Sequence, residues 1–172
     1  MTGWRLRLAR HDDAESFHRI EADAAGALAD VPALDGVPLP PPVAAEDYAK
    51  LIAKRHCLTV TAKDVPVGFV ATRPAGRAVH IAEISVLRRW QKQGIGAGLL
   101  RALAVAARNS GFDALTLDTF RDVPFNAPLY ARLGFVEVEN FESWPHLRQS
   151  LETAETLGMA PGLRVAMVRF LA

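Results

Sequence analysis

Hydrophobic and polar positions along the chain follow two periods, which predict an alternation of strands and helices. Alternating or short apolar runs predict strands at residues 4–9, 57–62, 67–73, 78–86, 114–120, 135–141 and 164–171. Apolar positions three and four apart predict five helices. The first begins after Asp12 or Asp13, which are placed to cap it, and the second begins near Ala44. The others lie at residues 94–109, 126–134 and 151–157. The pattern therefore indicates a mixed α/β fold.

The connections between these elements agree with one domain. The segment "KDVP" at residues 63–66 joins two strands as a hairpin. Residues 30–43 carry a cluster of prolines that prevents regular structure, so this segment is expected to be a loop. Too little chain precedes that loop to make a separate core, and residues 1–172 are expected to form a single domain.

The composition limits the classes of partner that can be expected for this protein. Half of the residues are hydrophobic and 23% are charged, which suits a protein with a buried core. Lys and Arg number 20 against 19 Asp and Glu, so the net charge favours neither a nucleic-acid nor a membrane partner. The single Cys57 allows no internal disulfide, and no signal peptide or run of ~18 apolar residues is evident. A cytoplasmic protein is expected, and the scattered histidines indicate no metal site.

The stretch "VLRRWQKQGIGAGLL", which starts at Val86, places Gly94 and Gly96 where a strand turns into a helix. The first turn of a helix has N–H groups without partners, and the helix dipole makes that end positive. Glycines there let a phosphate approach the N–H groups, so a pyrophosphate is the expected ligand. The alternative is that the glycines only let the helix pack closely on the sheet.

Two better-known glycine loops do not fit this stretch. A phosphate loop of the NTPase kind needs Lys and then Ser or Thr after its last glycine, whereas Leu99 and Leu100 follow Gly98. A dinucleotide fingerprint needs GxGxxG in the first βαβ unit, and here GxGxG comes late in the chain.

The segment resembles the acetyl-CoA signature of the GNAT superfamily of N-acetyltransferases. In that family a strand ending in Val is followed by an arginine-rich turn, Gln or Arg, two residues, Gly, one residue and Gly or Ala. Val86, Gln91, Gly94 and Gly96 match this pattern. Downstream, "NAPLYARLGFVEV" is similar to the family's "lYeklGF" element, with Tyr130 at the tyrosine position. The two motifs and the order of elements extend the resemblance over nearly the whole chain.

The resemblance implies a mostly antiparallel mixed central sheet flanked by helices, and acetyl-CoA as co-substrate. A bulge in the strand before the glycine loop would free N–H groups to polarise the acetyl carbonyl. Asn126 is the asparagine nearest to the tyrosine and the candidate for holding the pantetheine arm. The implied acetyl-CoA-binding residues are Ile84, Ser85, Val86, Gln91, Lys92, Gln93, Gly94, Ile95, Gly96, Ala97 and Asn126.

Transfer of an acetyl group to an amine needs a proton acceptor, and Glu83 is the first candidate. Strand alternation places Glu83 on one face with Ile81 and Ser85, where partial burial would raise the pKa of its carboxylate into a useful range. The alternative is an ordinary strand glutamate that faces solvent or pairs with an arginine. Asp118, near the end of a later strand, is the second candidate.

The departing thiolate needs a proton donor, and Tyr130 on the short helix is the candidate. A phenol with an ordinary pKa near ~10 stays protonated and can give its proton to a thiolate. The alternative is a tyrosine whose ring only packs in the core, and the two roles are compatible.

The function expected from these residues is direct transfer of an acetyl group from acetyl-CoA to an amine. The acceptor would be a small molecule or a peptide, with no nucleic acid and no membrane involved, and a homodimer is allowed. The alternatives are a noncatalytic module that binds or senses acyl-CoA, and an enzyme that uses a longer acyl group or a hydroxyl acceptor.

Overall fold

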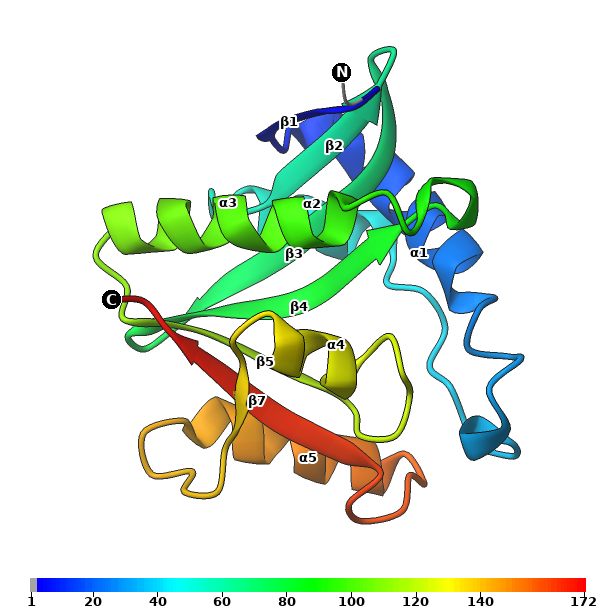
Figure 1. Cartoon of the computed structure of the whole chain (residues 1–172), viewed down its shortest axis with the longest axis vertical. Helices are drawn as coiled ribbons and strands as arrows, with labels where there is room; N and C mark the ends of the chain where they lie inside the picture. The colour runs from blue at the N-terminus through cyan, green and yellow to red at the C-terminus, as the bar shows by residue number, and fades with distance from the viewer. Residues whose placement is uncertain (1–2) are drawn as a thin grey trace.

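A seven-stranded sheet runs through the computed structural model, which describes residues 3–172 (Figure 1). The strand order is β1-β2-β3-β4-β5-β7-β6, and each neighbouring pair is antiparallel except β4 and β5. The predicted mixed, mostly antiparallel sheet is confirmed. The strands are β1 (Arg5–Leu8), β2 (Leu58–Ala62), β3 (Val65–Ala75), β4 (Ala78–Val86), β5 (Ala114–Phe120), β6 (Val136–Glu137) and β7 (Arg164–Phe170).

Helices cover both faces of this sheet (Figure 1). The α-helices are α1 (Ala14–Ala25), α2 (Ala45–Ile52), α3 (Ile95–Asn109), α4 (Ala127–Arg132) and α5 (Pro145–Thr156), and the 3-10 helices are η1 (His11–Asp13), η2 (Pro32–Leu34) and η3 (Arg88–Trp90). Helices α3 and α4 pack on one face, and α1, α2 and α5 pack on the other. None of the helices within residues 3–172 has the length and apolar character to cross a membrane.

Each face has its own apolar core. Leu99 and Leu103 of α3 lie on the face formed by Val70, Val79 and neighbouring strand residues, and all of them are buried. On the opposite face Phe17 of α1 stacks on Phe69 with ring centroids 4.1 Å apart. An aromatic pair of this kind adds about 0.5–1.5 kcal/mol to the free energy of unfolding beyond its buried area. The two helical layers therefore fix the sheet from both sides.

The parallel pair β4 and β5 diverges along its length. Their register extends only from Ala78↔Ala114 to His80↔Thr116. Beyond that point β4 pairs with β3 alone and β5 pairs with β7 alone. The sheet therefore opens between the distal halves of β4 and β5, next to the turn that leads into α3.

A β-bulge at Ala82 corrects one prediction about β4. The register passes from Thr72↔Ile81 to Ala71↔Glu83, so Ala82 has no partner on β3. Ile81 belongs to the core under α3, whereas Glu83 lies opposite Ala71, which belongs to the core under α1 and α2. Glu83 and Ile81 therefore face opposite sides of the sheet, because an inserted residue reverses the alternation.

Two elements differ most from their predicted bounds. The strand expected at residues 135–141 is limited to Val136–Glu137, because this edge strand pairs only with Met167 and Val168. The last helix begins at Pro145 and not at Leu151, since proline is well accommodated in a first helical turn.

The capping prediction for the first helix was wrong in its contact. A 3-10 turn, η1, precedes α1, and no side-chain hydrogen bond caps α1. The Asp13 carboxylate instead accepts hydrogen bonds from Arg7, the Arg10 N–H and Thr59. A buried carboxylate needs such partners, and the bonds hold its pKa below the usual range against the opposing effect of burial.

Candidate active site

The glycine-containing turn presents unpaired N–H groups at the start of α3. Gly94 has a φ of +81°, in the left-handed region that favours glycine. The N–H groups of residues 92–97 donate to no acceptor among the residues that the structure describes. A Cβ added at Gly94 or Gly96 would meet no atom within 4 Å, so the space beside these donors is open. The turn therefore has the shape and the dipole orientation that an anion needs.

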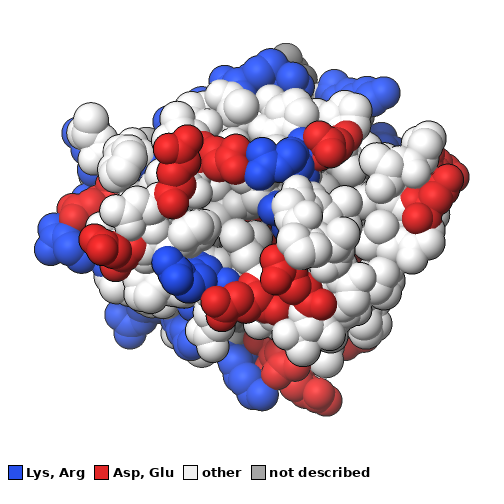
Figure 2. All heavy atoms as spheres, turned by 90° about the horizontal axis from the view of Figure 1, so that it is seen from below, with Lys and Arg blue, Asp and Glu red and all other residues white. Residues whose placement is uncertain are grey.

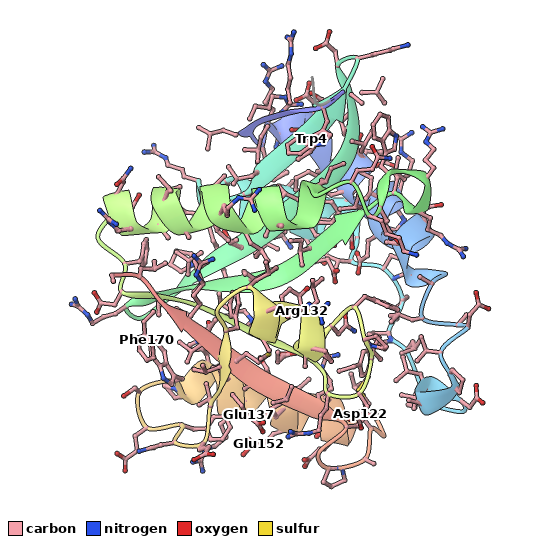
Figure 3. The ribbon with its side chains drawn as sticks, in the orientation of Figure 1. Trp4, Asp122, Arg132, Glu137, Glu152 and Phe170 are labelled. Atoms are coloured by element: carbon pink, nitrogen blue, oxygen red, sulfur yellow. The ribbon has the colours of Figure 1, made fainter. Side chains whose placement is uncertain are left out.

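The third glycine of the stretch, Gly98, is needed for a different reason. A Cβ at Gly98 would lie 2.9 Å from the ring of Trp4, which packs beside α3 at this point (Figure 3). Gly98 is therefore a packing glycine, whereas no close packing contact explains the glycines at positions 94 and 96.

The turn is held in place by α1 and by its own glutamine. The Arg88 N–H donates to the Asp23 carboxylate of α1 at 2.7 Å. The side-chain amide of Gln91 donates to the Val86 carbonyl at 3.0 Å and so bridges the end of β4 to the turn. Gln91 and Lys92 are both exposed, so the turn reaches solvent on its outer side.

A pocket of about 150 Å³ lies where β4 and β5 diverge. It brings together five residues that the sequence nominated, Glu83, Ile84, Asp118, Asn126 and Tyr130, with Arg164 from the start of β7. Beyond His80, β4 has no strand partner on the β5 side, so its backbone borders the pocket. The structure thus collects candidate groups from two strands and a helix in one place.

Glu83 is half-buried beside this pocket, and the Ser85 hydroxyl donates to its carboxylate at 2.9 Å. Its pKa is raised to about 7, chiefly by burial and next by the nearby charge of Glu21 on α1, while the Ser85 hydrogen bond and the charge of Arg164 oppose the rise. No arginine forms an ion pair with Glu83 within residues 3–172. Such a carboxylate can accept a proton near neutral pH.

Tyr130 is buried on α4, with its ring edge toward Phe135 at a centroid distance of 5.8 Å. Its N–H donates to the Asn126 carbonyl in the first turn of α4. Burial, and next the charge of Glu83, raise the pKa of the phenol. The residue therefore packs in the core and borders the pocket at the same time, protonated at neutral pH.

Asp118 has a partner that Glu83 lacks. Its carboxylate accepts from Nη2 of Arg164 at 2.5 Å and from Nε at 3.2 Å. The Arg164 guanidinium also lies over the Phe120 ring, 4.7 Å from its centroid. The Asp118 carboxylate is occupied by Arg164, whereas Glu83 forms no ion pair within the described part of the chain, so this geometry favours Glu83 over Asp118 as the proton acceptor.

The backbone and side chains near the end of β4 divide between the two faces. Ile84 borders the pocket, Ser85 is buried against Glu83, and Val86 packs toward α3. Ile95 is buried under the turn and anchors α3, while Gln93 and Ala97 lie on its outer side. Charged residues of both signs are interspersed on the face seen in Figure 2.

The acetyltransferase (GNAT) family model matches residues 27–135. The chain belongs to this family. The fold is also similar to that of the ribosomal-protein-S18-alanine N-acetyltransferase from Escherichia coli, with a TM-score of 0.70 and 17% identity over 98% of this chain and 94% of that chain. Ard1 from Thermoplasma volcanium gives a TM-score of 0.69 and 16% identity over 99% of each chain. The N-acetylglutamate synthase from Neisseria gonorrhoeae, solved with coenzyme A and N-acetyl-glutamate, gives 0.73 and 17% over 98% of this chain and 35% of that chain.

The sequence alone did not indicate two further residues of interest in this GNAT acetyltransferase, Glu21 and Arg164. Glu21 accepts hydrogen bonds from the Tyr48 hydroxyl at 2.5 Å and the Val43 N–H at 2.9 Å, and it acts on Glu83 by charge. Arg164 enters the pocket from the last strand. Glu21 looked like any polar position of an amphipathic helix. Only the alternation of side chains between the two faces of β7 could have distinguished Arg164 from its buried neighbours.

The histidines of the acetyltransferase are less scattered than the sequence indicated. Nδ1 of His80 lies 3.1 Å from the Thr116 hydroxyl, and Nε2 of His146 lies 2.9 Å from the same oxygen. Burial first, and then the charge of Arg73, lower the pKa of both rings, that of His80 to about 4. This network joins α5 to the parallel part of β4 and β5.

Proposed function

We propose that this acetyltransferase moves an acetyl group from acetyl-CoA to the amine of an acceptor by direct attack. The observation that carries the proposal is that Glu83, with a pKa of about 7, and the protonated Tyr130 border one pocket. That pocket lies beside the strand end that leads into the glycine turn. Base, acid and anion site are therefore arranged around the opening between β4 and β5.

The glycine turn would hold the pyrophosphate of acetyl-CoA. The free N–H groups of residues 92–97 and the open space at Gly94 and Gly96 fit a phosphate group. Asn126 borders the pocket and is placed for the pantetheine arm. The N. gonorrhoeae structure was solved with coenzyme A, which supports acetyl-CoA as the co-substrate. When bound, acetyl-CoA supplies the thioester that the amine attacks.

The protons can be followed through the residues of the pocket. The acceptor arrives as an ammonium ion and gives one proton to the Glu83 carboxylate. The neutral nitrogen attacks the acetyl carbon, an N–C bond forms, and the C–S bond breaks. The Tyr130 phenol gives its proton to the thiolate, and the second proton leaving the nitrogen restores the phenol. The proton on Glu83 then passes to solvent.

The proposal is tested by thiol release from acetyl-CoA with a panel of primary amines, and by mass measurement of the products. In Glu83→Gln the carboxylate is lost and the shape is kept, so turnover near pH 7.5 should fall by about 10²–10⁴-fold. The loss should narrow toward the pKa of the amine, where the nitrogen is neutral without help. Glu139→Gln, an exposed glutamate of the same type, is the matched control.

Two results would count against this function, and a third would change the group that accepts the proton. Tight acetyl-CoA binding without any acetylated amine would indicate a module that only binds acyl-CoA. Acetylated hydroxyls would replace the amine acceptor. A wild-type pH profile in Glu83→Gln would transfer the proton acceptor role to Asp118 or to water.

A further inference from the structure

Arg164 is a charged residue in the pocket that the proposed chemistry does not use. It stands at the start of β7, and its side chain is 20% exposed. It borders the pocket together with Glu83 and Tyr130, and its charge lowers the pKa of both groups. A largely buried guanidinium close to both reacting groups needs an explanation beyond packing.

Its contacts fix the guanidinium and leave one end free. Nε and Nη2 donate to the Asp118 carboxylate, Nη2 also donates to the Asp118 carbonyl at 2.9 Å, and the plane lies over Phe120. Nη1 donates to no acceptor within residues 3–172. Nη1 is also not among the buried side-chain atoms that lack a partner, so it remains accessible. The residue thus offers two unused N–H donors in a fixed direction.

Arg164 projects from the same face of the sheet as Glu83. Along β7, Val165 and Met167 point to the core under α3, so Arg164 and Ala166 point the other way. The bulge at Ala82 turns Glu83 to that face as well. The glycine turn leads into α3, on the opposite face. Arg164 is therefore placed for the acceptor and not for the phosphates of the co-substrate.

We propose that Arg164 binds a carboxylate of the acceptor, and that the acceptor is a small amino acid whose amine lies at Glu83. The proposal rests on the function proposed above. Arg–carboxylate contacts are charge-assisted and directional, which suits a guanidinium already held by Asp118. The pocket of about 150 Å³ must also admit the reactive end of the co-substrate beside Asn126 and Tyr130, so it leaves room for a small acceptor only. The charges of Arg164 and Asp118 cancel. A zwitterion also has no net charge, so its binding leaves the net charge of the site unchanged.

The test compares amines that differ only in the carboxylate. Glycine, L-leucine, L-glutamate, β-alanine and 4-aminobutyrate are each assayed against their carboxamides, where for glutamate the α-carboxylate is replaced. The pH is kept near 8.5 so that Glu83 is ionised. At least one amino acid should exceed its amide by about 10- to 100-fold in kcat/KM, the range of a charged hydrogen bond. An enzyme that uses every amide as well as its acid overturns the proposal.

Variants of Arg164 and Arg121 test which residue causes the preference for acids over amides. Arg164→Gln should bring the acid-to-amide ratio close to one, chiefly through KM, and Arg164→Lys should restore part of it. Arg121→Gln is the matched control, because Arg121 and Arg164 both border a second cavity of about 200 Å³ beneath α5. A ratio that survives Arg164→Gln, or that disappears in Arg121→Gln, places the carboxylate elsewhere and overturns the proposal. An equal loss with acids and amides shows a structural role and does the same.

A binding experiment separates this inference from the proposed function. N-acetyl-L-leucine, N-acetyl-L-glutamate and their matched amides are titrated calorimetrically into the protein saturated with coenzyme A. Tighter binding of an acid than of its amide, lost in Arg164→Gln, supports the carboxylate site even if no transfer is observed. Transfer to amines without any preference for acids in either assay leaves the proposed function standing and refutes this inference.

Discussion

At the scale of single residues, the pocket contains two carboxylates, those of Glu83 and Asp118, that have different surroundings. Burial and the nearby charge of Glu21 raise the pKa of Glu83 to about 7, and the hydrogen bond from the Ser85 hydroxyl opposes this rise. Asp118 lies in the same pocket and is paired with Arg164. One carboxylate is thereby left able to take a proton, and the other serves to hold a guanidinium. Residue type and strand position alone do not separate these roles.

Tyr130→Phe tests the acid. The variant keeps the ring and its contact with Phe135, so the free energy of unfolding and the affinity for acetyl-CoA should change little. Turnover should fall toward the low end of the ~10²–10⁴ range of a positioned acid, because a thiolate whose thiol has a pKa near ~8.5 can also leave unprotonated. The measurement is steady-state turnover of both proteins with acetyl-CoA.

A second thioester serves as the control for Tyr130→Phe. An acetyl thioester with a more acidic thiol needs the phenol less, so the difference between the two proteins should shrink with it. Full turnover of the variant with acetyl-CoA itself would make Tyr130 a core tyrosine only.

At the scale of elements, the start of α3 is an anion site made by backbone. Gly96→Asp would place a negative charge beside the unpaired N–H groups in space that is empty, so folding should persist while affinity for acetyl-CoA falls by about 100-fold or more. Gly96→Ala is the matched control. It adds a neutral Cβ in the same open space and should bind nearly as the wild type does. Calorimetry on both folded variants is the measurement, and equal affinities would refute the glycine-turn assignment.

The sequence predicted most elements and the glycine turn, because those signals are local. Helical spacing and strand alternation within a few residues specify α3 and β5 whatever the rest of the chain does. The bulge in β4 is different, since the resemblance implies a bulge in this strand but only the register against β3 reveals that it lies at Ala82. Alternation read from the sequence therefore put Glu83 beside Ile81, on the wrong face. The correct face is the one that meets Glu21 and Arg164.

At the scale of the whole molecule, the pocket is assembled from segments that are far apart in the chain. Glu21 comes from α1, Glu83 from β4, Tyr130 from α4 and Arg164 from β7. The order β4-β5-β7 brings the last strand to the opening beside β4, which no local pattern specifies. The candidate acid could be nominated from its motif and the candidate base from its strand, whereas their charged neighbours required the fold.

The same assembly sets how stability depends on pH. His80 has a folded pKa of about 4 against 6.5, because it is buried, so between these values the unfolded chain binds the extra proton and acidification destabilises the fold. Glu83 has a folded pKa of about 7 against 4.5, so in that window the folded chain holds the extra proton and acidification stabilises it. Burial also lowers the pKa of His146, so His146 acts in the same direction as His80, and both oppose Glu83 between about pH 5 and about pH 6.5.

We expect the wild-type free energy of unfolding to change less across that window than that of Glu83→Gln, and each single variant to expose the effect of the groups that remain. Glu83→Gln should lose stability on going from about pH 6.5 to about pH 5, by as much as about 2 kcal/mol. His80→Asn keeps a polar group near Thr116 and should gain stability over the same change. The measurement is urea unfolding at constant ionic strength, and only the slope with pH is compared, because the His80 variant also leaves a cavity. Parallel curves for all three proteins would mean that neither group titrates differently in the folded and unfolded states.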